Sequence, residues 1–507
     1  MLRRVYVTTA VYQGIAAVAT LAALRWLATY VDPETLGRYS LYQSVIVAGT
    51  LFLVSWPNAA LLRFGREEWT RDGRLGTTLG ARTALFAVCV AIAIAAAWVA
   101  DPWLRRFLGV DRSPFPWIAA GLLVTPAAEL AIYLSQAIGR TVVYGYSPAI
   151  VRIGFFVGVC LIPLFGRRAG WTYLAAWLIA STAAATLFTL ATTPRAAWEG
   201  FAIDRPMLAR LLRYSWMLPF GAVSTYVVNW IDAWVIRNVS GLAAVGVYSW
   251  AYQTTAIASL VFAPMAVALT PRVIDARLND DRARLERYTG SILPAALVCA
   301  AAVAASFVLV FPAIRALTSP AYAEAYPVVL VLLAALPFQL TAHLVTPLAS
   351  AYERLIPRFV MVSVLIAVVN VAGDLLLVRR FGIIGAAIAT AAAFAAGALV
   401  LVTVVRAEGL AFAPLWHYAA PGLVVFPAVA LMYFAGPFVG SAVIVATGAI
   451  ALAIGAFSRK RRARTTARAW PFSALAALGM ALTLDDEAHG GSAEGVRYPA
   501  APRAIES

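Results

Sequence analysis

Long apolar runs separated by short polar segments dominate this chain. Each run is about 20 residues long, the length that an α-helix needs to cross the hydrocarbon core of a bilayer. The runs do not alternate apolar and polar residues with the period of two that marks a membrane β-barrel strand. We therefore predict fourteen membrane-spanning helices, at 6–30, 39–62, 81–100, 116–138, 146–165, 171–191, 214–236, 244–270, 290–313, 325–349, 358–378, 383–405, 416–435 and 440–458.

Composition agrees with this pattern. Of the 507 residues, 62% are hydrophobic and 13% are charged, whereas globular domains average about 45–50% apolar and about 25% charged residues. A soluble enzyme and a disordered chain are both excluded. The predicted fold class is an all-α polytopic membrane protein. A shorter apolar run, 471–484, is expected to lie at the membrane interface.

The basic residues indicate orientation. The net charge is +16 and Lys460 is the only lysine. In a soluble protein this charge would suggest nucleic acid, but in a polytopic protein basic residues gather in loops that stay cytoplasmic. With the N-terminus inside, the inner segments hold 26 Arg and Lys residues, Arg82 among them, and the outer segments hold 10. We predict that both termini are cytoplasmic, with no nucleic-acid partner.

The loops are too short for a soluble domain. The longest are 101–115 outside and 192–213 and 271–289 inside. The cysteines lie singly in apolar runs and the histidines lie far apart, so we predict no disulfide, metal site or cofactor; these residues are Cys89, Cys160, Cys299, His343, His417 and His489. The first apolar run lacks an early cleavage site and is expected to be an uncleaved span.

Two segments of the chain repeat. Residues 37–43 (GRYSLYQ) resemble 246–253 (GVYSWAYQ), and 170–176 echoes 382–388 at nearly the same offset. The offset corresponds to six spans, and an even number predicts halves related by an axis along the membrane normal.

The repeat defines the predicted organisation and function class. The expected regions are a six-helix bundle 1–191, a cytoplasmic linker 192–212, a second bundle 213–406, helices 13 and 14 within 407–458, and a basic, partly disordered tail 459–507. Two facing bundles enclose a cavity that can open to either side. This plan indicates transport by alternating access.

Three junctions carry a family resemblance. Residues 32–40 (DPETLGRYS), 232–252 (DAWVIRNVSGLAAVGVYSWAY) and 370–390 (NVAGDLLLVRRFGIIGAAIAT) resemble helix junctions of Wzx-type polysaccharide flippases. That family belongs to the multidrug/oligosaccharidyl-lipid/polysaccharide exporter superfamily, abbreviated MOP. The resemblance extends over about residues 1–406.

The resemblance implies a function. It implies flipping of a polyprenyl-diphosphate-linked oligosaccharide across the bacterial cytoplasmic membrane for export of a surface polysaccharide. The family is driven by ion or voltage gradients, and this sequence has no phosphate-binding GxxxxGK[ST] loop. Implied partners are membrane lipids and the polymerase and glycosyltransferases of the same pathway.

Arginines within or beside the spans are the candidate substrate contacts. A guanidinium binds phosphate oxygens bidentately and stays charged, and charges inside a membrane are functional candidates. Arg25 and Arg152 lie in spans, and Arg63 lies at the inner end of another. The alternatives are snorkelling of Arg25 to the interface and a purely topological role for Arg63.

Acidic residues within spans are candidates for gating or ion coupling. We predict that Glu129 pairs with Arg152, as a structural ion pair or as a gate. Asp232 lies at nearly the same level of the repeat as Arg25, and their contact would close an outer gate.

Two further residues complete this set. Asp374 is expected to pair locally with Arg379 and Arg380, or to act with Asp232 as a coupling site for H⁺ or Na⁺. His343 titrates near neutral pH or is a packing residue. The aromatic residues Trp56, Tyr226 and Trp230 are candidates for stacking on sugars. Five prolines are expected to kink their spans and assist rocking: Pro57, Pro148, Pro219, Pro264 and Pro347.

Other functions remain open. A lipid II flippase has the same expected span number, and a drug/cation antiporter of the same superfamily would use Glu129, Asp232 and Asp374. A membrane glycan polymerase or glycosyltransferase is a more distant alternative, because such enzymes need acidic residues on a large outer loop. Asp32 and Glu34 are the one acidic pair in such a position. We therefore expect a transporter and no enzyme.

Overall fold

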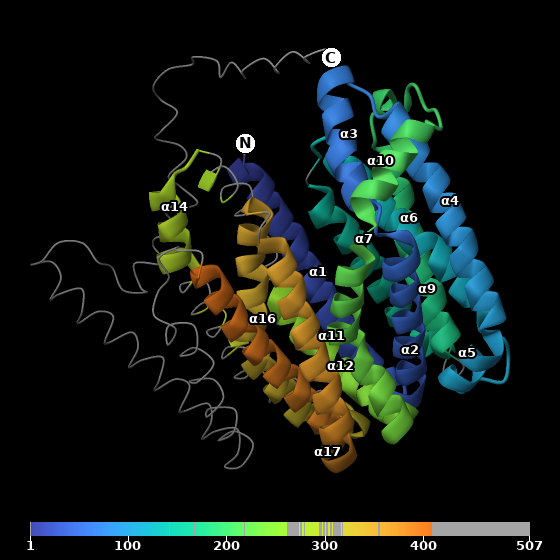
Figure 1. The fold of residues 1–507 in the computed structure, drawn as a ribbon. Helices are drawn as coiled ribbons and strands as arrows, with labels where there is room; N and C mark the ends of the chain where they lie inside the picture. Colours follow the sequence, from blue (N-terminus) through green and yellow to red (C-terminus); the bar gives the residue numbers. More distant parts are fainter. Residues whose placement is uncertain are drawn as a thin grey trace, which may run out of the picture.

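The computed structural model is a bundle of long helices (Figure 1). It describes residues 2–140, 142–165, 169–216, 218–260, 279–293, 318–352 and 355–407, with isolated positions between 273 and 316, and these contain no strand. Its longer helices are α1 (Leu2–Tyr30), α2 (Pro33–Gly49), α3 (Asn58–Asp72), α4 (Gly76–Val99), α6 (Phe115–Ala137), α7 (Val143–Cys160), α9 (Trp171–Ala191), α11 (Leu218–Val239), α12 (Leu242–Leu260), α16 (Ala325–Ala351) and α17 (Ile356–Arg406).

The prediction of a polytopic helical protein is confirmed. In the described part, six helices are long and apolar enough to cross a membrane, or seven if one bent pair is a single span. Helix α17 covers two predicted spans, 358–378 and 383–405, which meet where Gly382 has φ 58° and ψ −139°. The predicted spans 416–435 and 440–458, the run 471–484 and the tail lie outside the described residues, and the span at 290–313 lies mostly outside them.

The second span is broken. Helix α2 runs into a π-helical turn, η1 (Thr50–Val54), and α3 then departs at an angle of 51°. Pro57 lies between η1 and α3, where it cannot supply a helical N–H donor. The expected kink at Pro57 is confirmed, whereas the predicted limits 39–62 are too narrow.

Two segments expected to be loops form amphipathic helices. They are α5 (Asp101–Leu108) and α10 (Arg205–Ser215), and both have proline in the first turn. In α5, Leu104, Phe107 and Leu108 are buried on one face while its arginines face outward. Because α5 has 8 residues and α10 has 11, neither contains an apolar run of membrane-spanning length, and the hydropathy pattern did not predict them.

The two halves of the repeat pack directly against each other. A Cβ atom added to Gly37 would lie 2.1 Å from the Leu242 carbonyl oxygen, and one added to Gly246 would lie 1.8 Å from that of Pro33. The equivalent hydroxyls of Ser40 and Ser249 are 2.6 Å apart. Helices α2 and α12 therefore approach backbone to backbone, which glycine alone permits.

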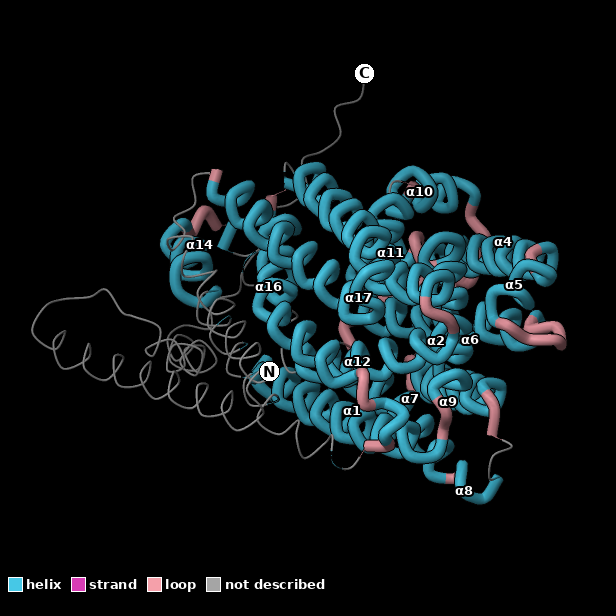
Figure 2. The backbone as a smooth tube through the Cα atoms, turned by 90° about the horizontal axis from the view of Figure 1, so that it is seen from below, coloured by secondary structure: helices cyan, strands magenta, loops and turns pink. Residues whose placement is uncertain are grey.

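Further contacts close the same end of the molecule. The Trp250 indole N–H donates to the Leu24 carbonyl oxygen at 2.9 Å. The Tyr322 hydroxyl donates to the Val31 carbonyl oxygen at 3.0 Å. On the other flank, Arg237 of α11 donates to the Phe107 carbonyl oxygen of α5 at 3.1 Å. Figure 2 shows α4, α6 and α9 on one side, α14 (Arg282–Arg287) and α16 on the other, and α11, α12 and α1 between them.

Replacing the repeat glycines should loosen this closed end. We expect Gly37→Ala and Gly246→Ala to separate α2 from α12, because each added methyl group would overlap a backbone carbonyl. The readout is disulfide formation between cysteines replacing Ser40 and Ser249, which should fall severalfold. Gly14→Ala is the matched control, since nothing lies within 4 Å of that position. Equal crosslinking in all variants would contradict the close contact.

Asp101 makes the connection after α4 sensitive to pH. Burial alone raises the pKa of this carboxyl, but hydrogen bonds from Ser113 at 2.6 Å and Arg105 at 2.7 Å outweigh burial and hold the pKa below its ordinary value. Because the pKa of Asp101 is lower in the folded protein than in the unfolded chain, its carboxylate stabilises the fold at pH values above the unfolded pKa of about 3.9. This stabilisation is lost as the pH falls through the pKa of the folded state.

We therefore expect Asp101→Asn to lower stability at pH 7 by about 1 kcal/mol, as partly exposed charged hydrogen bonds do. The difference from wild type should shrink below pH about 4. Thermal melting in detergent across this range measures it, with Asp111→Asn as control. A difference that is constant from pH 7 to pH 3 would exclude the carboxylate as its source.

Candidate functional site

Two carboxyl groups meet inside the second half of the chain. Asp232 of α11 is 2% exposed and Asp374 of α17 is 0% exposed. Their carboxyl groups are close enough to interact electrostatically. Two carboxylates this close cannot both keep a full charge without a shared proton or a cation.

Polar groups from α12 and α17 surround this pair. The Tyr248 hydroxyl of α12 donates to Asp232, and the Thr390 hydroxyl lies 2.7 Å from Asp232 Oδ2. Asn370 in turn donates to the Thr390 oxygen at 3.2 Å. No donor from the described residues reaches Asp232 Oδ1, Asn370 Oδ1 or either oxygen of Asp374. Buried oxygens without donors indicate a site for a proton or an oxygen-liganded cation.

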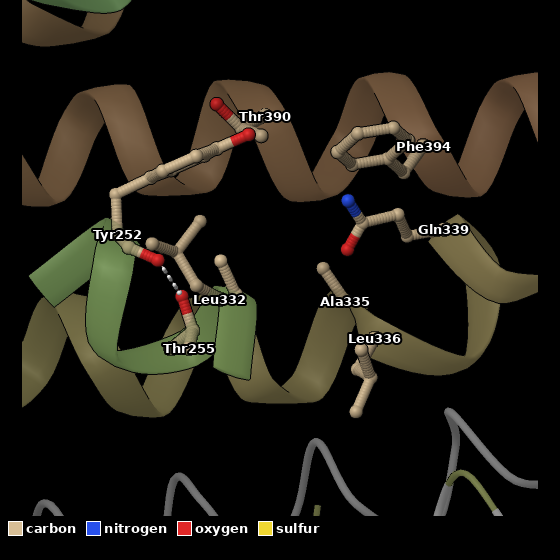
Figure 3. Close-up of a pocket in the computed structure, with 9 residues that line it drawn as sticks. Tyr252, Thr255, Leu332, Ala335, Leu336, Gln339, Thr390 and Phe394 are labelled. Atoms are coloured by element: carbon tan, nitrogen blue, oxygen red, sulfur yellow. Dashed lines mark hydrogen bonds between the residues drawn. The ribbon is translucent and has the colours of Figure 1, made fainter. Parts of the chain in front are cut away.

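A small cavity lies next to this site. It has a volume of about 20 Å³ and lies between α12, α16 and α17. In Figure 3, Tyr252 and Thr390 lie together at one end, and Gln339 and Phe394 lie at the other. The volume suits a single water molecule. Since Thr390 also contacts Asp232, the cavity adjoins the carboxyl pair.

The expected local pairing of Asp374 is wrong. Arg379 and Arg380 are exposed, and neither forms an ion pair with Asp374. The reason is helix rotation, because Asp374 faces α11 while the two arginines point away from the bundle. The alternative, in which Asp232 and Asp374 act together, stays a prediction, and the structure brings their side chains together.

A second charged cluster lies at the break in the second span. Arg82 of α4 is 0% exposed. It donates to Asn58 Oδ1 at 2.7 and 3.1 Å and to the Val54 carbonyl oxygen at 3.0 Å. Val54 precedes the break and Asn58 follows it. Arg82 thus joins the two parts of the span and satisfies a carbonyl that has lost its helical donor.

Glu129 of α6 belongs to this cluster. The Ser55 hydroxyl donates to Glu129 Oε2, and the carboxylate interacts electrostatically with Arg82. The expected ion pair between Glu129 and Arg152 is therefore wrong. Sequence neighbours suggested that pair, but α4 supplies the cation instead, because the bend in the second span brings Ser55 between α4 and α6.

Arg25 and Arg152 are the accessible intramembrane cations. Both side chains are exposed, and neither forms an ion pair with a described residue. Arg152 of α7 lies close to Tyr39 of α2, whose ring stacks on Phe155 at 5.7 Å. In this conformation the expected Arg25–Asp232 contact is absent, since Asp232 is enclosed by Tyr248 and Thr390.

The remaining candidates lie elsewhere. Arg63 is on the exposed side of α3, where it faces Glu67 at 3.8 Å and lies 5.0 Å from the centre of the Tyr214 ring of α10. It helps to attach α10 to α3. His343 belongs to α16, but its side chain is outside the described part of the structure.

Several residues of these clusters escaped the sequence analysis. Arg82 was counted as a topology signal because it lies near the start of an apolar run. Asn370 and Thr390 stood in a family-like junction without an assigned role. Arg82 could have been found from the sequence, because it is an arginine inside the predicted span 81–100. Asn370 and Thr390 could not, because uncharged Asn and Thr residues in a span give no such signal.

Solved structures share this architecture. A lipid II flippase MurJ in an inward closed conformation has a TM-score of 0.62 at 13% identity, over 88% of this chain and 98% of that chain. An inward-facing multidrug resistance MATE transporter of the MOP superfamily has a TM-score of 0.57 at 15% identity, over 78% of this chain and 95% of that chain. A MOP superfamily transporter from Pyrococcus furiosus, described as having a binding pocket of reverse polarity, has a TM-score of 0.57 at 14% identity. The similarity covers 80% of this chain and 96% of that chain.

The fold is therefore that of the MOP superfamily, a multi-pass helical protein built of two pseudo-symmetric bundles. A family model described as polysaccharide biosynthesis protein matches residues 2–276, more than half of the chain. The chain belongs to that family, so the resemblance seen in the sequence is confirmed. No curated protein sequence matches it.

The Arg82 cluster should be essential for stability. Arg82→Met leaves the buried Asn58 Oδ1 and the Val54 carbonyl oxygen without this donor. An unsatisfied buried acceptor costs about 1–3 kcal/mol, so the variant should have a melting temperature in detergent several degrees lower than wild type. Glu129→Gln should have a smaller effect, because an amide oxygen still accepts from Ser55. Arg71→Met is the control, since the Arg71 side chain is 76% exposed. An Arg82 variant as stable as the control would rule out this role.

Proposed function

We propose that this protein flips a polyprenyl-diphosphate-linked oligosaccharide from the inner to the outer leaflet of a bacterial cytoplasmic membrane. The observation that carries the proposal is membership of the polysaccharide biosynthesis family. The product would enter the export of a surface polysaccharide. Both termini would be cytoplasmic, and polymerase and glycosyltransferases of the same pathway would be the partners.

The distribution of intramembrane charge supports an anionic substrate. Arg25 and Arg152 are exposed, while Asp232 and Asp374 are buried and Glu129 accepts a hydrogen bond from Ser55. An accessible guanidinium is suited to a diphosphate, because it forms charge-assisted hydrogen bonds with its oxygens. In this proposal Arg25 and Arg152 hold the diphosphate, and Arg63 has no direct contact with it.

The carboxyl pair supplies the coupling in this proposal. Asp232 and Asp374 lie on helices that also contact α12, and α12 forms the closed end with α2. Binding of H⁺ or Na⁺ at the pair would change the charge between α11 and α17. A change at this position can bias the arrangement of the two bundles, provided the ion binds the two arrangements with different affinity.

A lipid II flippase is the second candidate. The structural similarity to MurJ favours it, with a TM-score of 0.62. Its substrate has the same polyprenyl-diphosphate chemistry, so the arginine roles would be unchanged. A drug antiporter is less well supported, because Asp232 and Asp374, two of the three acidic groups that would bind a cationic drug, are buried.

Reconstitution tests the proposal directly. Purified protein in liposomes should move a fluorescent polyprenyl-diphosphate oligosaccharide between leaflets, measured by quenching with dithionite. We expect Arg25→Gln and Arg152→Gln to slow flipping about tenfold or more, because charge-assisted hydrogen bonds contribute about 1.5–3 kcal/mol each. Arg112→Gln, in the loop after α5, is the matched control.

The same assay tests alternating access. A disulfide between cysteines replacing Ser40 and Ser249 should stop flipping, and reduction should restore it; each single cysteine is the control. Asp232→Asn and Asp374→Asn should abolish dependence on an ion gradient, while Asp111→Asn should not. Vesicles that transport ethidium but move no glycolipid would overturn the proposal in favour of a drug antiporter.

A further inference from the structure

A separate cavity lies at the break in the second span. Its volume is about 370 Å³. Ser55 and Trp56 come from the break, Glu129 and Tyr133 from α6, and Tyr144 from α7. The cavity is in the first half of the chain, on other helices than the carboxyl pair. The π-helical turn η1 forms part of its wall, and such turns are frequent at functional sites.

Glu129 offers a hydrogen-bond acceptor to this cavity. Ser55 donates to Oε2, which leaves the second oxygen, Oε1, as a further acceptor, and Glu129 lines the cavity. Tyr133, one helical turn away, is half-buried and also lines the cavity. An occupant can therefore donate to the carboxylate and exchange hydrogen bonds with a phenol.

The charge balance indicates which chemistry fits. Arg82 is buried and lies close enough to Glu129 to interact with it electrostatically. A cationic ligand would have to compete with Arg82 for the carboxylate. An acyl chain would leave Glu129 Oε1 and the Tyr133 hydroxyl without partners, which costs free energy. A neutral ligand with several hydroxyl groups avoids both costs.

The aromatic residues fit the same ligand. Trp56 donates its indole N–H to the Leu53 carbonyl oxygen at 3.3 Å, which leaves the ring face for contact. Tyr133 and Tyr144 add two further rings. The electron-rich face of an aromatic ring attracts the polarised C–H groups of a pyranose. Ring faces and hydroxyl acceptors together are the two surfaces that a sugar ring requires.

The position along α7 relates this cavity to the diphosphate contact. Tyr144 and Arg152 are on the same helix and eight residues apart, which corresponds to about 12 Å at 1.5 Å per residue. A lipid-linked glycan can extend over this distance from its diphosphate. We propose that the cavity lined by Trp56, Glu129 and Tyr133 is a subsite for a sugar ring of the lipid-linked glycan; this rests on the function proposed above.

The test compares lipids with and without sugar. Binding of undecaprenyl diphosphate and of undecaprenyl diphosphate carrying glucose, galactose or N-acetylglucosamine is measured by native mass spectrometry of the full-length protein. Wild type should bind at least one sugar-bearing lipid about five- to tenfold more tightly than the sugarless lipid. Trp56→Leu and Glu129→Gln should abolish this preference without changing affinity for the sugarless lipid.

Matched variants separate a contact from a folding defect. Trp98→Leu is the control, because Trp98 is 67% exposed on α4. Trp56→Phe keeps a ring and should retain most of the preference. A maleimide-labelling experiment, with Ala59→Cys as the only cysteine, adds a readout that leaves the aromatic rings intact. Sugar-bearing lipid should slow labelling severalfold, and sugarless lipid should not.

The outcomes distinguish this proposal from the function on which it rests. Tight binding of undecaprenyl diphosphate without a sugar preference, or equal weakening of both lipids by Trp56→Leu, would overturn the subsite and leave the flippase standing. Binding of neither lipid beyond phosphatidylglycerol would overturn both. Tetraphenylphosphonium binding that is lost in Glu129→Gln would identify a cation site instead.

Discussion

The backbone contact between α2 and α12 is the constraint on which the arrangement of the molecule depends. Gly37 and Gly246 allow each helix to touch a carbonyl oxygen of the other, and Ser40 and Ser249 bond across the contact. In a membrane, apolar side chains gain little by leaving lipid, so close packing and hydrogen bonds must hold helices together. This contact therefore determines which end of the two bundles is closed.

The bilayer explains how the remaining polar groups are distributed. An ionisable side chain in a span is costly unless it has a partner or lines a hydrated space. Arg82 and Glu129 have partners at a helix break, and Asp232 and Asp374 have each other together with Tyr248 and Thr390. Arg25 and Arg152 remain accessible. These two arginines are the groups to which the proposed function assigns the diphosphate.

The break in the second span links these features. Its π-helical turn and Pro57 free a carbonyl oxygen, which Arg82 satisfies, and the same bend opens the cavity beside Trp56 and Glu129. On the other side of η1, Phe52 packs edge-on against Tyr226 of α11 at 5.1 Å. One irregular segment therefore contacts both the cavity and a helix of the second half of the chain.

The sequence by itself determined the membrane class, most span positions, the repeat and the kink at Pro57, because hydropathy, proline and glycine act over a few residues. It also identified Asp232, Asp374 and Glu129 as unusual, since a charge in an apolar run is visible without a partner. Only the tertiary structure decided the partners. Asp232 lies beside Asp374 and Glu129 accepts from Ser55 because such contacts depend on the rotation and neighbours of each helix, and no local pattern records these.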